Sequence, residues 1–397
     1  MTDETTLPPA PSAAPIPLDR AAPLTAWLLY ALIVLEILFM VSPAAAYYYA
    51  VYAAPLNGLA DLPATAWLTL HVLPHFAYSD SALVNGLIAV SWPLIGIGTL
   101  LFLVGFVQIY GARLRQARGA PATEVASGLY RYIRHPQYLA LAVVGLGTAL
   151  FWSRFLVWIA FVLMLCLYSA LARLEERRCL RRFGDSYRRY MTRTGRFLPR
   201  PLEDQLAAIA HRGRPDRASG PGRRLAMGTM VALLSVGASV VAGGWLRDHA
   251  VASLQVARQG PHTLLFLAPL GAEQRARTAE LLAPRLGAEG RLVYLAPPGW
   301  TVPELGLSGA ADNGPGNLQE LAHPGSHGNR GGYGNTLLAL ITRPTLLQPA
   351  APGAGLLAAT VRIEPLRQLD LSLDSGAVSA PTPAGPGRWA GIPVPVY

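Results

Sequence analysis

The chain has 397 residues, of which 52% are hydrophobic and only 14% are charged. Soluble domains carry about 25% charged residues, so a large part of this chain is expected to avoid water. All 33 basic residues are arginine, and against 23 acids they give a net charge of +10. The two cysteines, Cys166 and Cys179, exclude a disulfide framework and a multi-cysteine zinc or iron–sulfur site.

The first membrane span is expected over residues 24–42, behind a Pro/Ala-rich tail at residues 1–22 that we predict to be disordered. The tail lacks the basic segment of a secretory signal peptide, so the apolar stretch should be retained. Its length suits one crossing of the hydrocarbon layer, and the tyrosines at residues 47–52 fit an interfacial belt. Glu36 inside this span is costly unless it faces protein or water, so it is a candidate for pairing an arginine or lining a substrate path.

Further apolar segments predict an α-helical integral membrane protein with about five membrane segments. A second span is expected over residues 84–110 and a last one over residues 225–245. Between them, residues 138–172 are divided by the polar pair Ser153 and Arg154 into two short arms. This pattern predicts a helical hairpin whose arms need not cross the membrane fully.

The placement of arginine predicts the orientation in the membrane. Residues 43–84 contain no arginine, whereas residues 111–136 contain five and residues 173–224 contain fifteen against six acids. Loops rich in arginine stay in the cytoplasm, so both are expected to face inward from an inner membrane, with the N-terminus. The last span would then place everything after it outside the cytoplasm. The basic excess is thus explained by topology and anionic lipid, and the sequence predicts no nucleic-acid partner.

The last part of the chain, residues 246–397, has a different character, with eleven arginines against ten acids and much Gly and Pro. A β-α-β pattern is expected from strands at 263–268 and 291–296 around a helix at 272–286. Further strands are expected at 336–342 and 356–363, in a small α/β domain with a Pro/Gly-rich tail. His323 and His327 are spaced i, i+4, but the prolines and glycines around them argue against a helical metal site, so no metal is predicted.

Five parts are therefore expected along the chain: a tail at 1–22, a membrane domain at 23–200, a basic cytoplasmic linker at 201–224, an additional transmembrane helix at 225–245, and an extracytoplasmic α/β domain at 246–397.

The residues with chemical potential lie in the stretch GLYRYIRHPQYLA at 128–140 and in the arginine-rich segment 175–200. Pro136 suits the first turn of a helix. Glu176 begins a series that continues as Leu180, Phe183, Tyr187 and Tyr190, on one face if the helix is continuous. Gly184 and Asp185 equally fit a helix end followed by a new N-cap. A carboxylate on such an aromatic face needs a partner and is a functional candidate.

A less specific interpretation is that Glu175 and Glu176 form surface salt bridges with the neighbouring Arg177 and Arg178. His135 by itself would be an interfacial histidine, and Cys179 among arginines is expected to be structural.

Taken together, the motifs resemble those of integral membrane methyltransferases related to isoprenylcysteine carboxyl methyltransferase and to phospholipid methyltransferases. The resemblance covers roughly residues 85–200, in the family's order. It rests on G-x-Y at 128–130, R-H-P-x-Y at 134–138, E-E at 175–176, F-G-x-x-Y-x-x-Y at 183–190 and R-F-L-P at 196–199.

The resemblance implies an S-adenosylmethionine site at the cytoplasmic face, and a lipophilic or small-molecule methyl acceptor. A carboxylate or an aromatic face suits the cationic cofactor. Carried over by position, the cofactor-binding residues would be Tyr130, His135, Pro136, Gln137, Tyr138, and Glu175 or Glu176. The candidates for a catalytic role are Arg134 and Arg173, the latter being nearest to the arginine that the family often places one turn before the glutamates. Ala140 stands where the family often has glycine.

Two other functions remain open at this level. One is an NADPH-dependent membrane reductase of related architecture. The other is a non-catalytic anchor or complex subunit in which the C-terminal domain is the working part and contacts a membrane-complex partner. The acceptor itself could be a carboxylate, a thiol or an amine.

Overall fold

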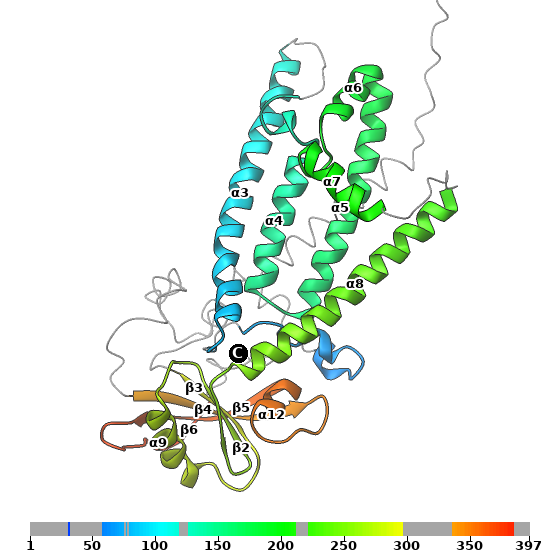
Figure 1. Ribbon diagram of the computed structural model, residues 1–397. Helices are drawn as coiled ribbons and strands as arrows, with labels where there is room; N and C mark the ends of the chain where they lie inside the picture. Colours follow the sequence, from blue (N-terminus) through cyan, green and yellow to red (C-terminus); the bar gives the residue numbers. More distant parts are fainter. Residues whose placement is uncertain are drawn as a thin grey trace, which may run out of the picture.

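The computed structural model (Figure 1) describes Ala31 and residues 58–74, 77, 79–118, 126–211, 221–296 and 336–384. The tail, the expected span at 24–42 with Glu36, and the pair His323 and His327 lie outside the described residues.

Long apolar helices dominate the described part of the chain. They are α3 (Ala82–Ala117), α4 (Pro136–Phe151), α5 (Phe155–Phe183) and α8 (Pro221–Ala252). Within the described residues, three helices, α3, α5 and α8, have the length and composition to cross a membrane, while α4 is shorter. A mostly helical membrane protein is confirmed, whereas the described residues do not provide the five segments expected.

The hairpin is present, but its second arm is longer than expected. Helix α4 ends at Phe151 and α5 begins at Phe155, so the turn contains Ser153 and Arg154 as the sequence predicted. The prediction of two short arms is wrong for α5, which has 29 residues and continues to Phe183. The reason is local: the Arg, Glu and Leu residues after residue 172 are strong helix formers and carry the helix beyond the apolar layer.

Glycines allow α3 and α4 to pack closely. A Cβ atom built on Gly147 of α4 would lie 2.8 Å from the backbone oxygen of Ser91 and 2.8 Å from Cγ1 of Ile95. A Cβ atom on Gly98 of α3 would lie 2.7 Å from Cγ2 of Val144. Small residues at such contacts let two helix backbones approach within a membrane, and these contacts hold the second half of α4 against α3.

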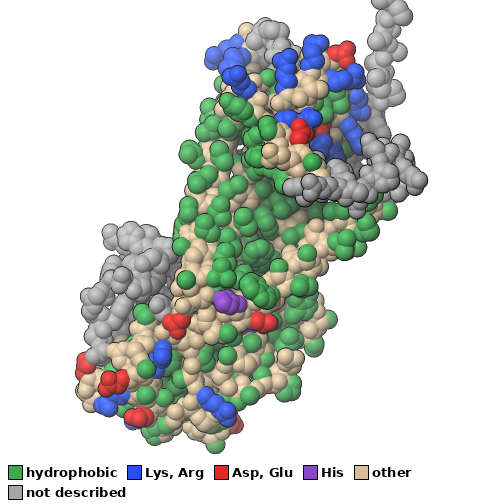
Figure 2. Space-filling view, in the orientation of Figure 1, with side chains coloured by type: hydrophobic (Ala, Val, Ile, Leu, Met, Phe, Trp, Pro, Cys, Tyr) green, Lys and Arg blue, Asp and Glu red, His purple; other side chains and the backbone are tan. Residues whose placement is uncertain are grey.

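At the arginine-rich end, α5 stops at Gly184, whose φ of +55° favours glycine. Helix α6 (Asp185–Arg193) then begins, so the alternative of a helix break is the one that the structure adopts. Helix α7 (Arg200–His211) follows, and a short 3-10 helix η3 (Gly128–Arg131) precedes α4. Figure 2 shows arginine side chains gathered at this end, above a band of apolar side chains along the helices.

The C-terminal part forms one sheet with the strand order β1-β2-β3-β4-β5-β6. Strands β2 and β3 are parallel and are joined through α9 (Ala272–Leu282) and η4 (Ala283–Arg285), which is the expected β-α-β unit, and every other pair is antiparallel. The strand bounds are Val256–Gln259, His262–Phe266, Leu292–Ala296, Thr336–Leu346, Thr360–Ser372 and Thr382–Pro383.

One strand prediction was wrong in its first half. The residues expected to begin a strand at 356 lie in helix α12 (Ala354–Ala359), and β5 begins at Thr360. The sequence AGLLAA consists largely of strong helix formers, whereas the β-branched pair Thr360 and Val361 favours a strand.

Both faces of the central strands are buried. Successive residues alternate between two clusters, so Leu264 and Val293 pack with α9. Leu265 and Tyr294 lie in a cluster shared with α12 and with Trp152 at the hairpin turn. The sheet therefore lies at the end of the helices opposite the arginines (Figure 1).

An arginine joins the two parts. Arg247, which is 5% exposed, lies near the end of α8 and donates to the backbone oxygens of His71 and Ala358. His71 follows the 3-10 helix η2 (Ala66–Thr69), and Ala358 belongs to α12. The α/β domain is thus attached directly to the helical part.

The glycine contact between α3 and α4 can be tested with a matched pair of variants. Gly147→Ala should destabilise the protein by about 1–3 kcal/mol, because the added methyl group meets backbone atoms that cannot yield easily. Gly96→Ala is the control, since a Cβ atom there meets nothing within 4 Å. Thermal unfolding in detergent should show a lower midpoint for Gly147→Ala and an unchanged or higher midpoint for Gly96→Ala. Equal midpoints would contradict the close contact.

Candidate functional site

The R-H-P motif is held by backbone pairing with the segment that precedes α7. The amide of Arg134 donates to the oxygen of Gly195 at 2.9 Å, and the amide of His135 donates to the oxygen of Arg196 at 3.0 Å. In return, the amide of Gly195 donates to the oxygen of Tyr132 at 3.2 Å. Two motifs separated by the whole hairpin are thus brought into one short ladder.

A carboxylate of α7 holds the segment at 195–197, which forms one strand of this ladder. Glu203 accepts hydrogen bonds from the amides of Arg196 at 2.8 Å and Phe197 at 2.9 Å. Glycine is required at residue 195, because a Cβ atom there would lie 1.8 Å from the backbone oxygen of Leu198. Sequence reasoning did not select Glu203, and its position after the R-F-L-P motif was the available signal.

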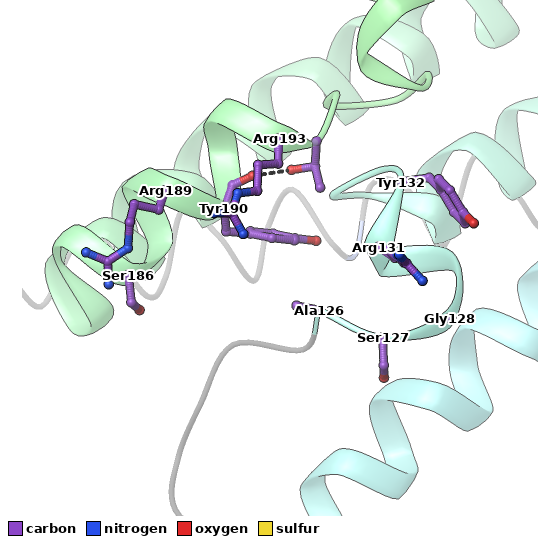
Figure 3. Close-up of a pocket in the computed structure, with 10 residues that line it drawn as sticks. Ala126, Ser127, Gly128, Arg131, Tyr132, Ser186, Arg189, Tyr190 and Arg193 are labelled. Atoms are coloured by element: carbon purple, nitrogen blue, oxygen red, sulfur yellow. Dashed lines mark hydrogen bonds between the residues drawn. The ribbon is translucent and has the colours of Figure 1, made fainter.

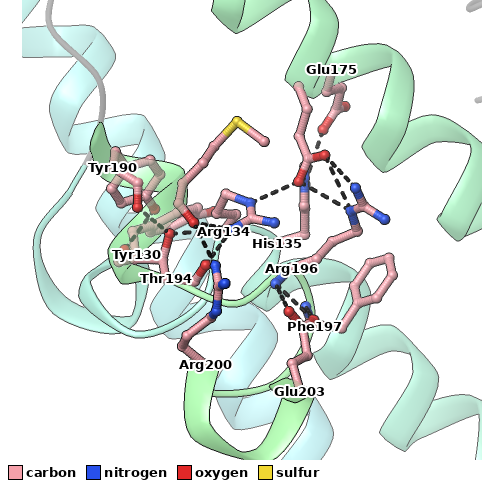
Figure 4. A network of polar contacts seen from close by, with 12 residues as sticks. Tyr130, Arg134, His135, Glu175, Tyr190, Thr194, Arg196, Phe197, Arg200 and Glu203 are labelled. Atoms are coloured by element: carbon pink, nitrogen blue, oxygen red, sulfur yellow. Dashed lines mark hydrogen bonds and ion pairs between the residues drawn. The ribbon is translucent and has the colours of Figure 1, made fainter. Parts of the chain in front are cut away.

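Glu176 is buried between Arg134 and Arg196, both of which Figure 4 labels. Its Oε1 accepts from Nε of Arg134 at 2.7 Å, and its Oε2 accepts from Nη2 of Arg196 at 2.7 Å. Nε of Arg196 adds contacts at 3.1 and 3.2 Å. The Glu176 side chain is only 5% exposed, so its charge is balanced inside the protein. These ion pairs of Glu176 form with arginines that are distant in the sequence.

Arg134 is fully engaged in holding the loop. Besides Glu176, its Nη1 donates to the backbone oxygen of Met191 at 3.2 Å and to that of Thr194. Its side chain is 7% exposed. Arg134 therefore connects the R-H-P motif to α5 and to the C-terminal end of α6 through hydrogen bonds.

Glu175 has a different environment from its neighbour. It accepts from the hydroxyl of Tyr138 at 2.9 Å, and its Oε2 lies 3.3 Å from Nδ1 of His135. Its side chain is 30% exposed, so part of the carboxylate faces the outside of the cluster. Of the two adjacent glutamates, Glu175 is the one accessible to a ligand.

His135 lies between both carboxylates and is 8% exposed. Burial alone would lower the pKa of His135, but the hydrogen bonds and negative charges of Glu175 and Glu176 outweigh it and raise the pKa above its usual value. Its Nε2 is 3.6 Å from Oε1 of Glu176. The two carboxylates thus favour the protonated imidazole.

Aromatic rings form a column beside these carboxylates. The ring of His135 stacks on Tyr138 with centroids 5.5 Å apart, and Tyr138 stacks on Tyr168 with centroids 5.0 Å apart. Phe197 lies 6.0 Å from His135 in a tilted orientation. Sequence reasoning missed Tyr168, although its position two helical turns before Glu175 places both on one face of α5.

The remaining predicted residues lie around this cluster. Gln137 and Pro136 contact α3 at Gly105, where a Cβ atom would lie 3.3 Å from Cγ of Gln137 and 4.0 Å from Cγ of Pro136. Tyr130 is buried, and its backbone oxygen accepts from the hydroxyl of Tyr190 at 2.6 Å. Arg173 is exposed and forms no ion pair with any other described residue. The structure therefore gathers His135, Tyr138 and the glutamates, and leaves Gln137 and Arg173 outside the cluster.

Residues 94–186 match the phospholipid methyltransferase family. The matched segment begins inside α3 and ends at the start of α6, so it contains the R-H-P-x-Y motif, the hairpin and both glutamates. The resemblance seen in the sequence is thereby confirmed, and it supports a membrane methyltransferase in general terms. Neither a curated protein nor a solved structure matches the chain.

The two glutamates of the matched segment should differ in their effect on stability. Glu176→Gln should lower the free energy of unfolding by about 3–5 kcal/mol, because it leaves two buried or half-buried guanidinium groups without their carboxylate. Glu175→Gln should have a much smaller effect, since its side chain is partly solvated. Thermal unfolding in detergent, with retention on size exclusion, compares the two variants. Equal stability of both variants would contradict the central role of Glu176.

Proposed function

We propose that the protein transfers a methyl group from S-adenosylmethionine to a small or lipid-like acceptor at the arginine-rich face of the membrane. The observation that carries this proposal is the cluster of Glu175, His135 and Tyr138 at the polar end of the hairpin, inside the segment that matches the methyltransferase family.

The cluster fits the charge of this cofactor, which combines a sulfonium with an ammonium group. A carboxylate attracts such cations, and the faces of aromatic rings add cation–π attraction. Glu175 supplies a carboxylate with an accessible side, and the column of His135, Tyr138 and Tyr168 supplies ring faces beside it. Glu176 is already bound to Arg134 and Arg196, so we assign it a positioning role.

Bound in this place, S-adenosylmethionine would supply an electrophilic methyl group. The contribution of the protein is to hold and orient. Tyr138 donates to Glu175 and fixes the direction of its carboxylate, while Tyr168 supports the ring of Tyr138 from α5. Arg134 and Arg196 fix the loop that carries His135. Alignment of two reactants can supply about 7–11 kcal/mol in favourable intramolecular cases, so a rigid site of this kind suits methyl transfer.

The proposed methyl acceptor is a carboxylate, a thiol or an amine on a small or lipophilic molecule. Large exposed apolar side chains on α3, such as Leu100, Phe106 and Val107, show that the helices beside the site are suited to lipid contact. A lipophilic acceptor could therefore reach the site from the bilayer without crossing water.

The proposed role of Glu175 predicts a loss of cofactor affinity in Glu175→Gln. Glutamine keeps the size of the side chain but removes the charge, so affinity for S-adenosylmethionine should fall by roughly ten- to a hundredfold. Titration calorimetry on the detergent-purified protein measures this change. The control is Arg177→Gln/Arg181→Gln, which changes two exposed arginines of α5 outside the cluster.

The affinity of wild type and of Glu175→Gln for S-adenosylhomocysteine shows which cationic group of the cofactor lies at Glu175, because this product lacks the sulfonium but keeps the ammonium. A smaller loss for the product would place the sulfonium at Glu175, and an equal loss would place the ammonium there. Equal affinity of wild type and Glu175→Gln for the cofactor would contradict the assignment. Incubation of membranes with methyl-labelled cofactor, followed by identification of the labelled product, tests the reaction itself and would identify the acceptor.

We further propose that the arginine-rich end faces the cytoplasm of an inner membrane and that the C-terminal α/β domain lies outside it. The arginine asymmetry supports this orientation, since the domain and the arginines occupy opposite ends of the helices (Figure 2). A reporter active only in the cytoplasm should stay inactive when fused after Tyr397. The same reporter inserted after His211 should be active, and the reverse pattern would overturn the orientation.

A further inference from the structure

A second concave site lies beside the candidate methyl-transfer site. It has a volume of about 790 Å³ and is formed between the η3 segment and α6 (Figure 3). Its lining includes Tyr190 and Thr194 but none of His135, Tyr138, Glu175 or Glu176. Arg134, which contacts both Thr194 and Glu176, lies between the two sites.

One face of α6 supplies much of the lining. Ser186, Arg189, Tyr190 and Arg193 follow each other at intervals of three, one and three residues, so they share one side of the helix. Arg131 and Ser127 belong to the other side of the pocket, at and just before η3 (Figure 3). The pocket therefore gathers three guanidinium groups from two separate segments, with hydroxyl groups between them.

Among the residues that the structure describes, no acidic side chain lines the pocket to balance these three positive charges. Among the described residues, Arg131, Arg189 and Arg193 form no ion pair with Asp or Glu, whereas the neighbouring Arg188 is paired with Asp185 at 3.0 Å. Three unbalanced guanidinium groups around a cavity favour an anion, and planar guanidinium groups suit the oxygens of a phosphate.

The depth of the pocket points to the same ligand. The η3 segment is held near the end of an apolar span, because the amide of Leu129 donates to Oε1 of Gln108 at 3.0 Å and the candidate span of α3 ends at Ala112. If α3 crosses the membrane, the pocket lies at the level of the lipid phosphates.

We propose that this pocket binds a phosphate group, carried either by an acidic phospholipid or by a soluble phosphate ester, at a site separate from the methyl-transfer site. A bound phosphate would offset part of the positive charge of the three arginines and hold α6 against the η3 segment. Tyr190, whose hydroxyl donates to the backbone of Tyr130, already joins these two segments from within the pocket.

The test compares two arginine pairs with the same spacing. Arg189→Gln/Arg193→Gln removes two charges from the pocket, and Arg177→Gln/Arg181→Gln removes two exposed charges of α5 that do not line it. The soluble arm is titration of the detergent-purified protein with glycerol 3-phosphate. The lipid arm is native mass spectrometry of phosphatidylglycerol retained after transfer from nanodiscs, with phosphatidylcholine nanodiscs for comparison. Arg131→Gln is a second pocket variant, located on the other segment.

The proposal expects the pocket pair to reduce binding by at least about tenfold in one of the two arms, and the α5 pair to leave it nearly unchanged. The arm that responds identifies the source of the phosphate. Equal losses in both pairs would indicate general attraction to positive charge and would overturn the proposal, as would absence of binding to the wild type in both arms.

Binding of S-adenosylmethionine to the same variants separates this inference from the proposed function. The Arg189→Gln/Arg193→Gln variant should bind S-adenosylmethionine with an affinity within about threefold of wild type, because exposed charges that do not touch the cofactor contribute little to its binding. Loss of cofactor binding with phosphate binding unchanged would assign the pocket to the cofactor and overturn the inference. Phosphate binding by a wild type that binds no cofactor would support the pocket and reject the proposed function. Arg131→Gln keeps the comparison valid if the α6 pair proves unstable.

Discussion

The ion pairs of Glu176 with Arg134 and Arg196 are the constraint on which the polar end of this molecule depends. A buried carboxylate is costly unless it is paired and hydrogen-bonded, and here two guanidinium groups from different segments satisfy it. One arginine precedes α4 and the other precedes α7, so a single side chain of α5 holds together three parts of the chain. Backbone hydrogen bonds between residues 134–135 and 195–196 fix how the two arginine-bearing segments lie relative to each other. Removal of the carboxylate would leave these loops held by the backbone ladder and by Glu203, with two guanidinium groups unpaired from Glu176.

This arrangement divides two adjacent glutamates between structure and recognition. Glu176 faces inward and is saturated by arginine, while Glu175 is partly exposed and contacts Tyr138 and His135. Successive residues on a helix are about 100° apart, so neighbours in sequence can meet entirely different surroundings. The aromatic column beside Glu175 is braced from α5 by Tyr168, which gives the ring faces a fixed orientation. A charged ligand would thus meet a surface that needs little rearrangement.

The candidate methyl-transfer site and the arginine-lined pocket lie at one end of the helices, and the α/β domain lies at the other (Figure 1). The domain is attached through Arg247 and through the cluster that includes Trp152 at the hairpin turn. The rigid helices α4 and α5 connect this turn with His135 and Glu175. Helix α3 provides a second connection, because the amide of Asp80 before it donates to the oxygen of Ser253 and Gln108 near its other end accepts from the amide of Leu129.

The sequence by itself determined the apolar helices, the hairpin turn at Ser153 and Arg154, the β-α-β unit and the resemblance to phospholipid methyltransferases that the match over residues 94–186 bears out, because apolar length, residue order and motif spacing are local properties. It also selected His135, Tyr138 and the glutamate pair. Only the tertiary structure decided that Glu176 pairs with Arg134 and Arg196 while Glu175 stays accessible, since these partners are distant in the sequence. The same reason applies to Tyr168 and Glu203, whose roles depend on ring stacking and on a backbone ladder. The sequence-based predictions for the length of α5 and for residues 356–359 were wrong. In both places strong helix formers extend or form a helix that the hydropathy pattern does not indicate.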